Sequence, residues 1–215
     1  MFNKIWKLRM RNFWLGSLFL FMVSCSPAKL SKWKETPAGE NVFKSYFDST
    51  NTPVRYKTDV TVYGRFFSGI LFVKYLNDTT CHVAFTTMPG TKLFEMQLTP
   101  RTDTIYECFE KMNRPAVLKG IKKNIRIFVM LDNYIGEAKS FYKEDFKGVL
   151  WRKYTPDHLY QFYQPEGHPI NKIELMSKSF SKRIVLDVRA FKEEVPVDIH
   201  IHNHNYKLDI HLTHL

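Results

Sequence analysis

The sequence predicts an α+β fold in which a strongly curved antiparallel sheet of about eleven strands is closed on one side by a few helices. Two observations lead to this prediction. Short segments rich in β-branched and aromatic residues follow one another with turn residues between them, as in up-and-down antiparallel strands. Helical periodicity is confined to a few stretches, which are too few for the strand–helix–strand units of a parallel sheet.

The composition is that of a folded, moderately basic chain. Of its 215 residues, 44% are hydrophobic and 25% are charged, which is typical of a globular protein. The formal net charge is +11, and a basic surface suits an anionic membrane or an acidic ligand. The sequence contains no motif of nucleic-acid recognition, so we expect no nucleic-acid partner.

The first 24 residues have the pattern of an export signal. Basic residues come first, at Lys4, Lys7, Arg9 and Arg11, and the apolar run that follows over residues 13–23 is too short to span a bilayer as a helix. Ser24 and Cys25 close the run. We therefore predict a removed signal over 1–24, a polar tether with two prolines over 25–39 and a single domain over 40–215.

The first half of the domain is expected to hold a helix and five strands. Apolar spacing over residues 40–49 favours a short helix that packs on the sheet, with membrane contact as the alternative. A loop with a glycine at each end is expected over 64–69. Strands are expected over residues 56–63, 70–76, 81–87, 92–98 and 103–109.

A longer helix is predicted over about residues 113–130, with Asn113 as its cap and Pro115 in its first turn. One face is apolar, with Leu118, Ile121, Ile125, Phe128 and Val129. The other face is basic, and it is either solvated or in contact with anionic lipid headgroups, through Lys119, Lys122, Lys123 and Arg126. A loop or short helix is expected over 136–146, and then strands over 149–154, 159–163, 171–177, 183–191, 195–203 and 206–214.

The last two strands alternate apolar residues with histidine and aspartate. If the apolar residues share one face, the turn is His204-Asn205 and the apolar pairs are Ile201 with Leu208, Ile199 with Ile210 and Val197 with Leu212. The polar pairs on the other face are then His200 with Asp209, His202 with Lys207 and Asp198 with His211. Such pairs account for the histidines without an ion, so we expect no metal site.

The remaining cysteines, Cys81 and Cys108, are expected to be free and mostly buried. Their strands are separated by a third one, which places the two residues near opposite edges of the sheet. A disulfide needs the two Cα atoms within about 7 Å of each other.

Several stretches resemble known families. Met22-Val23-Ser24-Cys25 resembles a bacterial lipobox. Residues 86–96, where a strand enters a Pro/Gly turn and an alternating strand leaves it, and the closing hairpin over 195–210 resemble the LolA/LolB superfamily of lipoprotein carriers and receptors. Residues 63–74 and Asn113-Arg114 resemble uncharacterised lipoproteins of Bacteroidetes-type bacteria.

These resemblances imply a location and a fold. The lipobox implies acylation of Cys25, with chains such as palmitate, and hence a membrane anchor. Because no acidic residue follows before Glu35, we expect a lipid-anchored protein of the outer membrane that faces the periplasm. The superfamily implies an eleven-stranded half-barrel whose helices form a lid over an apolar cavity for acyl chains.

The same resemblance implies candidate site residues. We expect the cavity to be lined by Val60, Val62, Phe72, Phe85, Phe94, Ile125 and Phe128, because the chain carries a heavy aromatic load of 18 phenylalanines and 11 tyrosines. Met88 and Pro89 occupy the position of a turn that contacts the membrane in the receptor.

The function expected is binding of a lipid or of lipoprotein acyl chains, by a monomer, without a cofactor and without catalysis. A structural or scaffolding lipoprotein that acts through protein contacts is the alternative. An enzyme is not expected, because the sequence lacks the Gly-x-Ser-x-Gly, His-Glu-x-x-His and glycine-rich phosphate motifs. His82, His158 and His168 have no evident partners in the sequence.

Overall fold

The computed structural model describes residues 32–36, 46–47, 52–77, 79–129 and 138–215. The chain divides into a short unit, Met1–Lys34, and a large unit, Glu35–Leu215. The predicted signal, Cys25 and most of the predicted tether and of the 40–49 helix lie outside the described residues. Within the described part, no helix is both long and apolar enough to cross a membrane.

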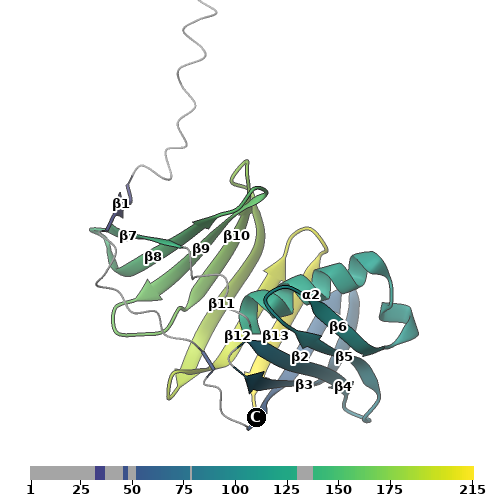
Figure 1. Cartoon of the computed structure of the whole chain (residues 1–215). Helices are drawn as coiled ribbons and strands as arrows, with labels where there is room; N and C mark the ends of the chain where they lie inside the picture. Colours follow the sequence, from purple (N-terminus) through teal and green to yellow (C-terminus); the bar gives the residue numbers. More distant parts are fainter. Residues whose placement is uncertain (1–31, 37–45, 48–51, 78, 130–137) are drawn as a thin grey trace, which may run out of the picture. The chain divides into compact units, whose positions relative to one another are not determined.

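The described strands form one sheet, and the predicted fold class is confirmed (Figure 1). Thirteen strands are present where about eleven were predicted, in the order β1-β7-β8-β9-β10-β11-β12-β13-β2-β3-β4-β5-β6. Their bounds are β1 (Lys34–Glu35), β2 (Val54–Val62), β3 (Arg65–Asn77), β4 (Thr80–Thr87), β5 (Lys92–Leu98), β6 (Asp103–Cys108), β7 (Lys139–Lys143), β8 (Phe146–Tyr154), β9 (His158–Pro165), β10 (Lys172–Ser177), β11 (Lys182–Lys192), β12 (Val195–Asn203) and β13 (Leu208–His214).

Two antiparallel meanders make up this sheet. Strands β7 to β13 pair in chain order, and so do β2 to β6. The pairing of β13 with β2 joins the two runs, from Leu208 opposite Val62 to His214 opposite Tyr56. The first and last long strands of the domain are therefore neighbours, so the closing hairpin lies in the middle of the sheet.

The two additional strands fall in segments that were predicted differently. Strand β1 lies within the predicted tether, where the Thr36 backbone N–H donates to the Ser140 carbonyl at 2.9 Å and Glu35 forms an ion pair with Lys139. Strand β7 occupies much of the segment predicted as a loop or short helix over 136–146, and β8 begins at residue 146 instead of 149. These two strands were not predicted because the sequence of both segments is mixed and polar.

The loop predicted over residues 64–69 is wrong. Tyr63 and Gly64 both have positive φ angles, 48° and 76°, and form a two-residue turn, so β3 begins at Arg65. Gly69 lies inside this strand, where a Cβ atom would come within 2.0 Å of the Thr86 carbonyl oxygen. Its lack of a side chain permits close strand contact and does not mark a loop.

The predicted register of the last hairpin is wrong by two residues. Ile201 pairs with Ile210 and Asn203 with Leu208, so the turn spans residues 204–207. Asn203 continues the buried face, with a relative exposure of only 1%, and its Oδ1 accepts a hydrogen bond from the Asn205 backbone. The predicted turn began directly after Asn203, because this polar residue was not expected on the buried face of the strand.

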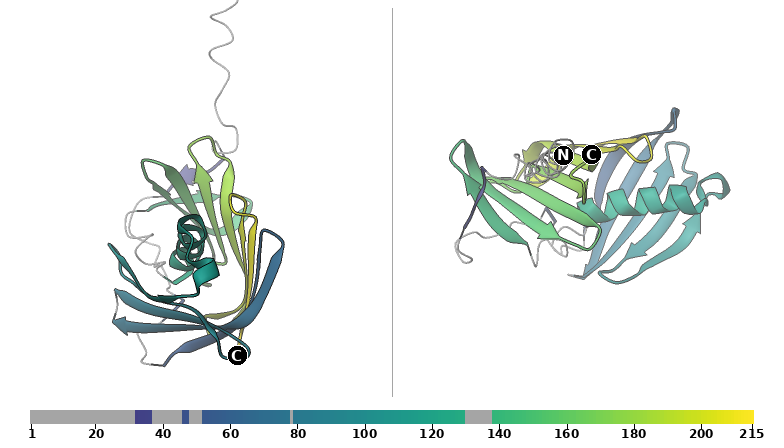
Figure 2. Two further views of the ribbon diagram at one scale, coloured as in Figure 1. Left: turned by 90° about the vertical axis from the view of Figure 1, so that its right-hand side faces the viewer. Right: turned by 90° about the horizontal axis from the view of Figure 1, so that it is seen from above.

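The α-helix α2 (Pro115–Val129) packs inside the curve of the sheet (Figure 2). Its predicted apolar face is buried. Residues of this face, among them Ile121, Ile125 and Phe128, join a core that also contains Tyr46 and Phe47. Those two residues, which fall in the predicted 40–49 helix, are not helical. The Leu118 backbone N–H donates to the Arg114 carbonyl, so Arg114 and not Asn113 precedes α2, while Asn113 ends the 3-10 helix η2 (Glu110–Met112).

Both described cysteines are free, as predicted. Cys81 is buried and Cys108 is half-buried. They flank β5 at opposite ends, since Cys81 pairs with Leu98 and Cys108 with Phe94. Burial raises the pKa of the Cys81 thiol to about 12, which keeps it protonated and unreactive at neutral pH.

Candidate functional site

A large cavity lies between α2 and the concave face of β2–β5, β12 and β13. Its volume is about 1070 Å³, at the upper end of the range of about 300–1,000 Å³ typical of ligand pockets. One wall is the sheet and the other is the buried face of α2. The apolar side chains that line it include Val60, Val62, Phe67, Leu71, Phe85, Phe94, Val117, Ile121, Ile125, Phe128, Ile201, Leu208, Ile210 and Leu212.

Six of the seven residues expected at the cavity line it, namely Val60, Val62, Phe85, Phe94, Ile125 and Phe128. The structure places Phe72 elsewhere. Leu71 and Val73 on either side of it are buried toward the core, so Phe72 points to the other face of β3, beside Arg55 and Ala84. The role of the six in binding a ligand remains a prediction.

Several lining residues were missed by sequence reasoning. Phe67 was assigned to a loop, and Ile201, Leu208, Ile210 and Leu212 were treated only as core residues of a hairpin. Tyr206 was placed in a strand, but it lies in the turn and packs on α2, where a Cβ atom on Gly120 would be 3.1 Å from its ring. The pairing of β13 with β2 places the closing hairpin at the cavity, and this pairing joins segments that are distant in the sequence.

The interior of the cavity offers almost no polar groups. Thr58 lines it, but this residue is only 2% exposed and its hydroxyl donates to the Tyr56 carbonyl at 3.1 Å. No aspartate or glutamate is among the lining residues. A polar ligand placed inside would lose its hydrogen bonds to water without replacement, whereas a hydrocarbon chain would lose none.

The mouth of the cavity is basic and aromatic. Arg65, Lys111 and Arg114 line this part and are exposed. Tyr63 and Phe66, at the β2–β3 turn, are 59% and 66% exposed although they are large. We call these five residues the rim. Cationic groups beside exposed rings suit an anionic group at a membrane or at the end of a bound molecule.

Met88 and Pro89 form the tip of the β4–β5 turn. Both are exposed, Met88 by 67%, and neither lines the cavity. Because Thr87 pairs with Gly69, the turn extends beyond the end of β4 in the direction of the first residues of β3. Met88 and Pro89 therefore lie at the same end of the sheet as the rim.

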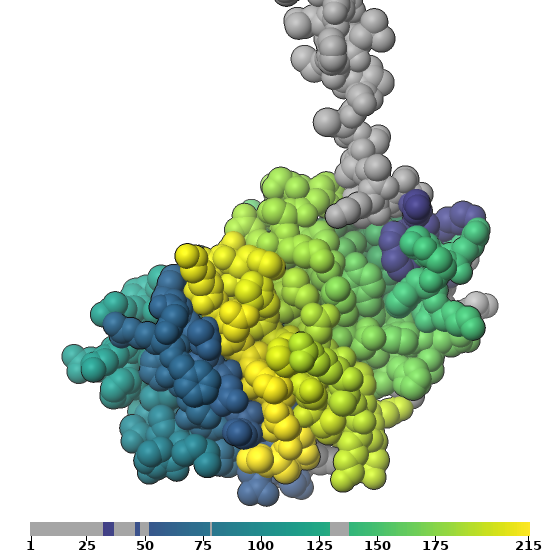
Figure 3. Space-filling view, turned by 180° about the vertical axis from the view of Figure 1, so that it is seen from behind, coloured from purple at the N-terminus to yellow at the C-terminus, as the bar shows by residue number. Residues whose placement is uncertain are grey.

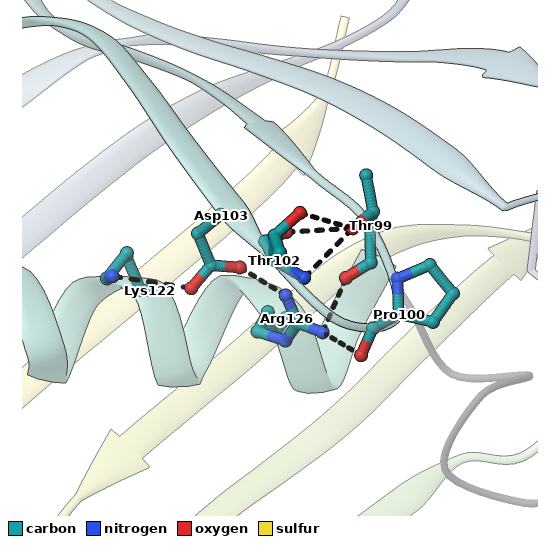
Figure 4. A network of polar contacts seen from close by, with 6 residues as sticks. All are labelled: Thr99, Pro100, Thr102, Asp103, Lys122 and Arg126. Atoms are coloured by element: carbon teal, nitrogen blue, oxygen red, sulfur yellow. Dashed lines mark hydrogen bonds and ion pairs between the residues drawn. The ribbon is translucent and has the colours of Figure 1, made fainter.

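A polar network fixes α2 against the β5–β6 turn (Figure 4). Asp103 forms ion pairs with Arg126 and Lys122. Arg126 Nη2 also donates to the carbonyl oxygens of Thr99, at 2.7 Å, and Pro100, at 3.1 Å. Lys122 and Arg126 are therefore engaged with the protein and are not free for lipid headgroups, whereas Lys119 is exposed.

Another basic residue of α2 contacts the meander formed by β7–β13. Lys123 Nζ lies 3.1 Å from His158 Nε2. Burial, and then the charges of Lys123 and Arg183, lower the pKa of His158, so its neutral ring accepts the bond. His82 also has a partner, since its Nε2 is 3.0 Å from Glu95 Oε1.

A buried amide pair links α2 to β12. Asn203 Nδ2 donates to Asn124 Oδ1 at 3.2 Å, and Asn124 Nδ2 donates to the Gly120 carbonyl at 2.8 Å. Both side chains are at most 1% exposed. Since buried amides are costly unless paired, this contact sets where the helix lies along the strand and so how much of the concave face stays uncovered.

These features define a class of protein, namely an open, curved antiparallel sheet that holds an apolar cavity under one helix. No family model matches the chain, and no curated protein matches it either. Among solved structures, a LolA superfamily protein from Nitrosomonas europaea is similar, with 9% identity over 79% of this chain and 86% of that chain and a TM-score of 0.50. This likeness shows that the two chains share a fold.

Two further solved structures are similar with lower scores. One is a DUF1329 family protein from Desulfovibrio piger, with 6% identity over 77% of this chain and 85% of that chain and a TM-score of 0.45. The other is an outer membrane lipoprotein-sorting protein domain from Vibrio parahaemolyticus, with 7% identity over 78% and 85% and a TM-score of 0.44. None of these likenesses bears on the resemblance to Bacteroidetes-type lipoproteins, which stays a prediction.

The network around Asp103 predicts a stability effect. Asp103→Asn keeps the shape of the side chain but removes the charge that pairs with Arg126 and Lys122, so we expect the free energy of unfolding to fall by about 1–3 kcal/mol in urea denaturation. Lys139→Ala breaks an exposed ion pair and should change it by less than about 0.5 kcal/mol. Equal effects of the two variants would contradict the role given to Asp103.

Proposed function

We propose that this protein is a membrane-anchored lipoprotein of the cell envelope that binds a lipid, or the acyl chains of a lipoprotein, in the cavity under α2, and that it catalyses no reaction. The observation that carries this proposal is the cavity itself, about 1070 Å³ in volume, with apolar walls and without acidic residues. A scaffolding protein would have no use for so much unfilled apolar surface.

The rim supports a bound molecule with two chemically different ends. Hydrocarbon fits the walls formed by residues such as Phe94 and Ile125, while Arg65, Lys111 and Arg114 stand at the mouth. An amphiphile with an anionic head would place each part in a suitable environment. The end of the sheet that carries both the rim and the Met88-Pro89 turn would then face the membrane that supplies or receives the lipid.

The anchor is proposed from the N-terminal sequence. The lipobox-like Met22-Val23-Ser24-Cys25 supports acylation of Cys25, and the absence of acidic residues before Glu35 supports the outer membrane, with the domain in the periplasm. The similarity in fold to a LolA superfamily protein is compatible with this location. The predicted monomer also belongs to this proposal.

Binding in the cavity is tested by filling it. Val60 points into the cavity. Val60→Trp should therefore weaken binding of a dansyl-labelled fatty acid about tenfold or more, because the indole occupies the space of the acyl chain. Thr61→Trp is the matched control, since the next residue of β2 points to the other face, and it should bind as the parent protein does. Fluorescence titration measures both.

Bound lipid in the purified protein provides a second readout. Organic extraction and mass spectrometry should recover acyl chains from the parent protein and fewer from Val60→Trp. A parent protein that yields no lipid and takes up no labelled fatty acid would favour the scaffolding alternative instead.

Transfer to membranes tests the exposed turn. Met88→Glu places a charge at the tip of the turn and should slow transfer of the dansyl fatty acid to phosphatidylglycerol vesicles roughly fivefold or more, without changing its affinity. Leu76→Glu is the control, because Leu76 is 50% exposed but lies at the far end of β3 from the rim. Equal rates for the parent and Met88→Glu would exclude the turn from membrane contact.

The lipid anchor is tested at its attachment site. Replacing Cys25 by serine removes the thiol that would be acylated, so Cys25→Ser should leave the signal uncleaved or release the domain from the membrane. Cell fractionation and the mass of the protein measure this. A Cys25→Ser variant that is cleaved and still membrane-bound would show that no lipid on Cys25 holds the protein.

A further inference from the structure

A cluster of metal-ligating side chains lies on the face of the sheet away from the cavity. Asp198 and His200 of β12 and His211 of β13 each offer one ligand atom, and these three atoms lie within 4.8 Å of one another. The cluster arises from the observed register, in which His200 pairs directly with His211. The expectation that no metal is bound was based on a different register, which is wrong.

The spacing of the cluster suits a metal ion. Asp198 Oδ1 lies 3.0 Å from His211 Nε2 and 3.8 Å from His200 Nε2. Ligand atoms at about 2.0–2.1 Å from a tetrahedral zinc ion are about 3.4 Å apart, which is between these two distances. The imidazole centroids of His200 and His211 are 4.1 Å apart, so the two rings lie side by side on this face.

The Nε2 atom of His200 is shielded from solvent and has no hydrogen-bond partner, although the side chain as a whole is 35% exposed. Such an atom is costly in a folded protein and calls for an explanation. His200 Nε2 lies 3.8 Å from Asp198 Oδ1, which is beyond hydrogen-bond distance, so its nitrogen can offer a lone pair to an ion. A metal ion at this point would use that lone pair.

Two further carboxylates flank the histidine pair. Asp187 of β11 pairs with His200, and Asp59 of β2 pairs with His211, so four residues form one row across four neighbouring strands. Seen from the side opposite to α2, β12 and β13 lie beside β2 with no other element over them (Figure 3). Carboxylates beside metal-binding histidines orient the rings and raise their basicity.

We propose that Asp198, His200 and His211 bind a divalent transition metal ion, for which Zn²⁺ is the probe, with water in the remaining position. Nitrogen and carboxylate ligands in this number are those that zinc takes when one position stays open. The ion links β12 to β13 behind Ile201 and Ile210, which line the cavity, and so stiffens that wall from outside.

Calorimetric titration of ZnCl₂ into the purified, chelator-treated protein tests this site. We expect saturable binding of one equivalent, with about tenfold or greater weakening in both His200→Asn and His211→Asn. His168→Asn alters an exposed histidine in another turn and should bind as the parent protein does. Co²⁺ in place of Zn²⁺ should give the visible absorption of a low-symmetry site in the parent protein and in His168→Asn, but not in His200→Asn or His211→Asn.

Three outcomes would overturn the proposal. These are no saturable binding to the parent protein, unchanged affinity in both histidine variants, and loss of binding in His202→Asn in place of His200→Asn, since His202 has Asp209 as its own partner. Circular dichroism in chelator checks that each variant is folded, and the Co²⁺ spectrum of the parent protein stands without any variant. Binding of the dansyl fatty acid is measured separately, so the lipid proposal and this one can fail independently.

Discussion

The geometry of this protein depends on a mismatch between a wide curved sheet and a single described α-helix. The apolar side chains of β2–β5, β12 and β13 must be removed from water, and α2 is the element that covers them in the described part of the chain. The helix is narrower than the concave face, so burial is incomplete and a cavity of about 1070 Å³ remains. The curvature that hides the core therefore also creates this cavity.

Polar contacts, and not apolar ones, decide where the helix lies in that space. Apolar packing alone would let α2 settle deeper, because hydrophobic burial has no preferred direction. The paired amides of Asn124 and Asn203 and the charges of Arg126 and Asp103 have definite partners, and moving the helix would leave them unpaired in a partly buried setting. These contacts fix the helix against β12 and the β5–β6 turn, and the rim residues Lys111 and Arg114 precede its N-terminal end.

The sequence predicted eleven of the thirteen strands, the helix α2 and six cavity residues, because each depends on local alternation. Val60, Phe85 and Phe94 lie on strands whose period-2 pattern is clear, and Ile125 and Phe128 lie on the apolar stripe of a helix. Phe72 was misassigned, since alternation does not state which of two half-buried faces is the concave one. The contacts of the basic residues of α2 were missed because their partner Asp103 is distant in sequence. The register of the closing hairpin was missed because Asn124, the partner of Asn203, is also distant in sequence.

The closing hairpin shows how one register determines two sites. Its apolar positions face the cavity and its polar positions face outward, so a shift by two residues leaves the first pattern intact but exchanges every polar pair. The shift was invisible in the apolar pattern because Asn203 replaces an apolar residue in the buried series. Its partner Asn124 makes that replacement tolerable, so the amide pair that positions α2 over the cavity also brings His200 opposite His211.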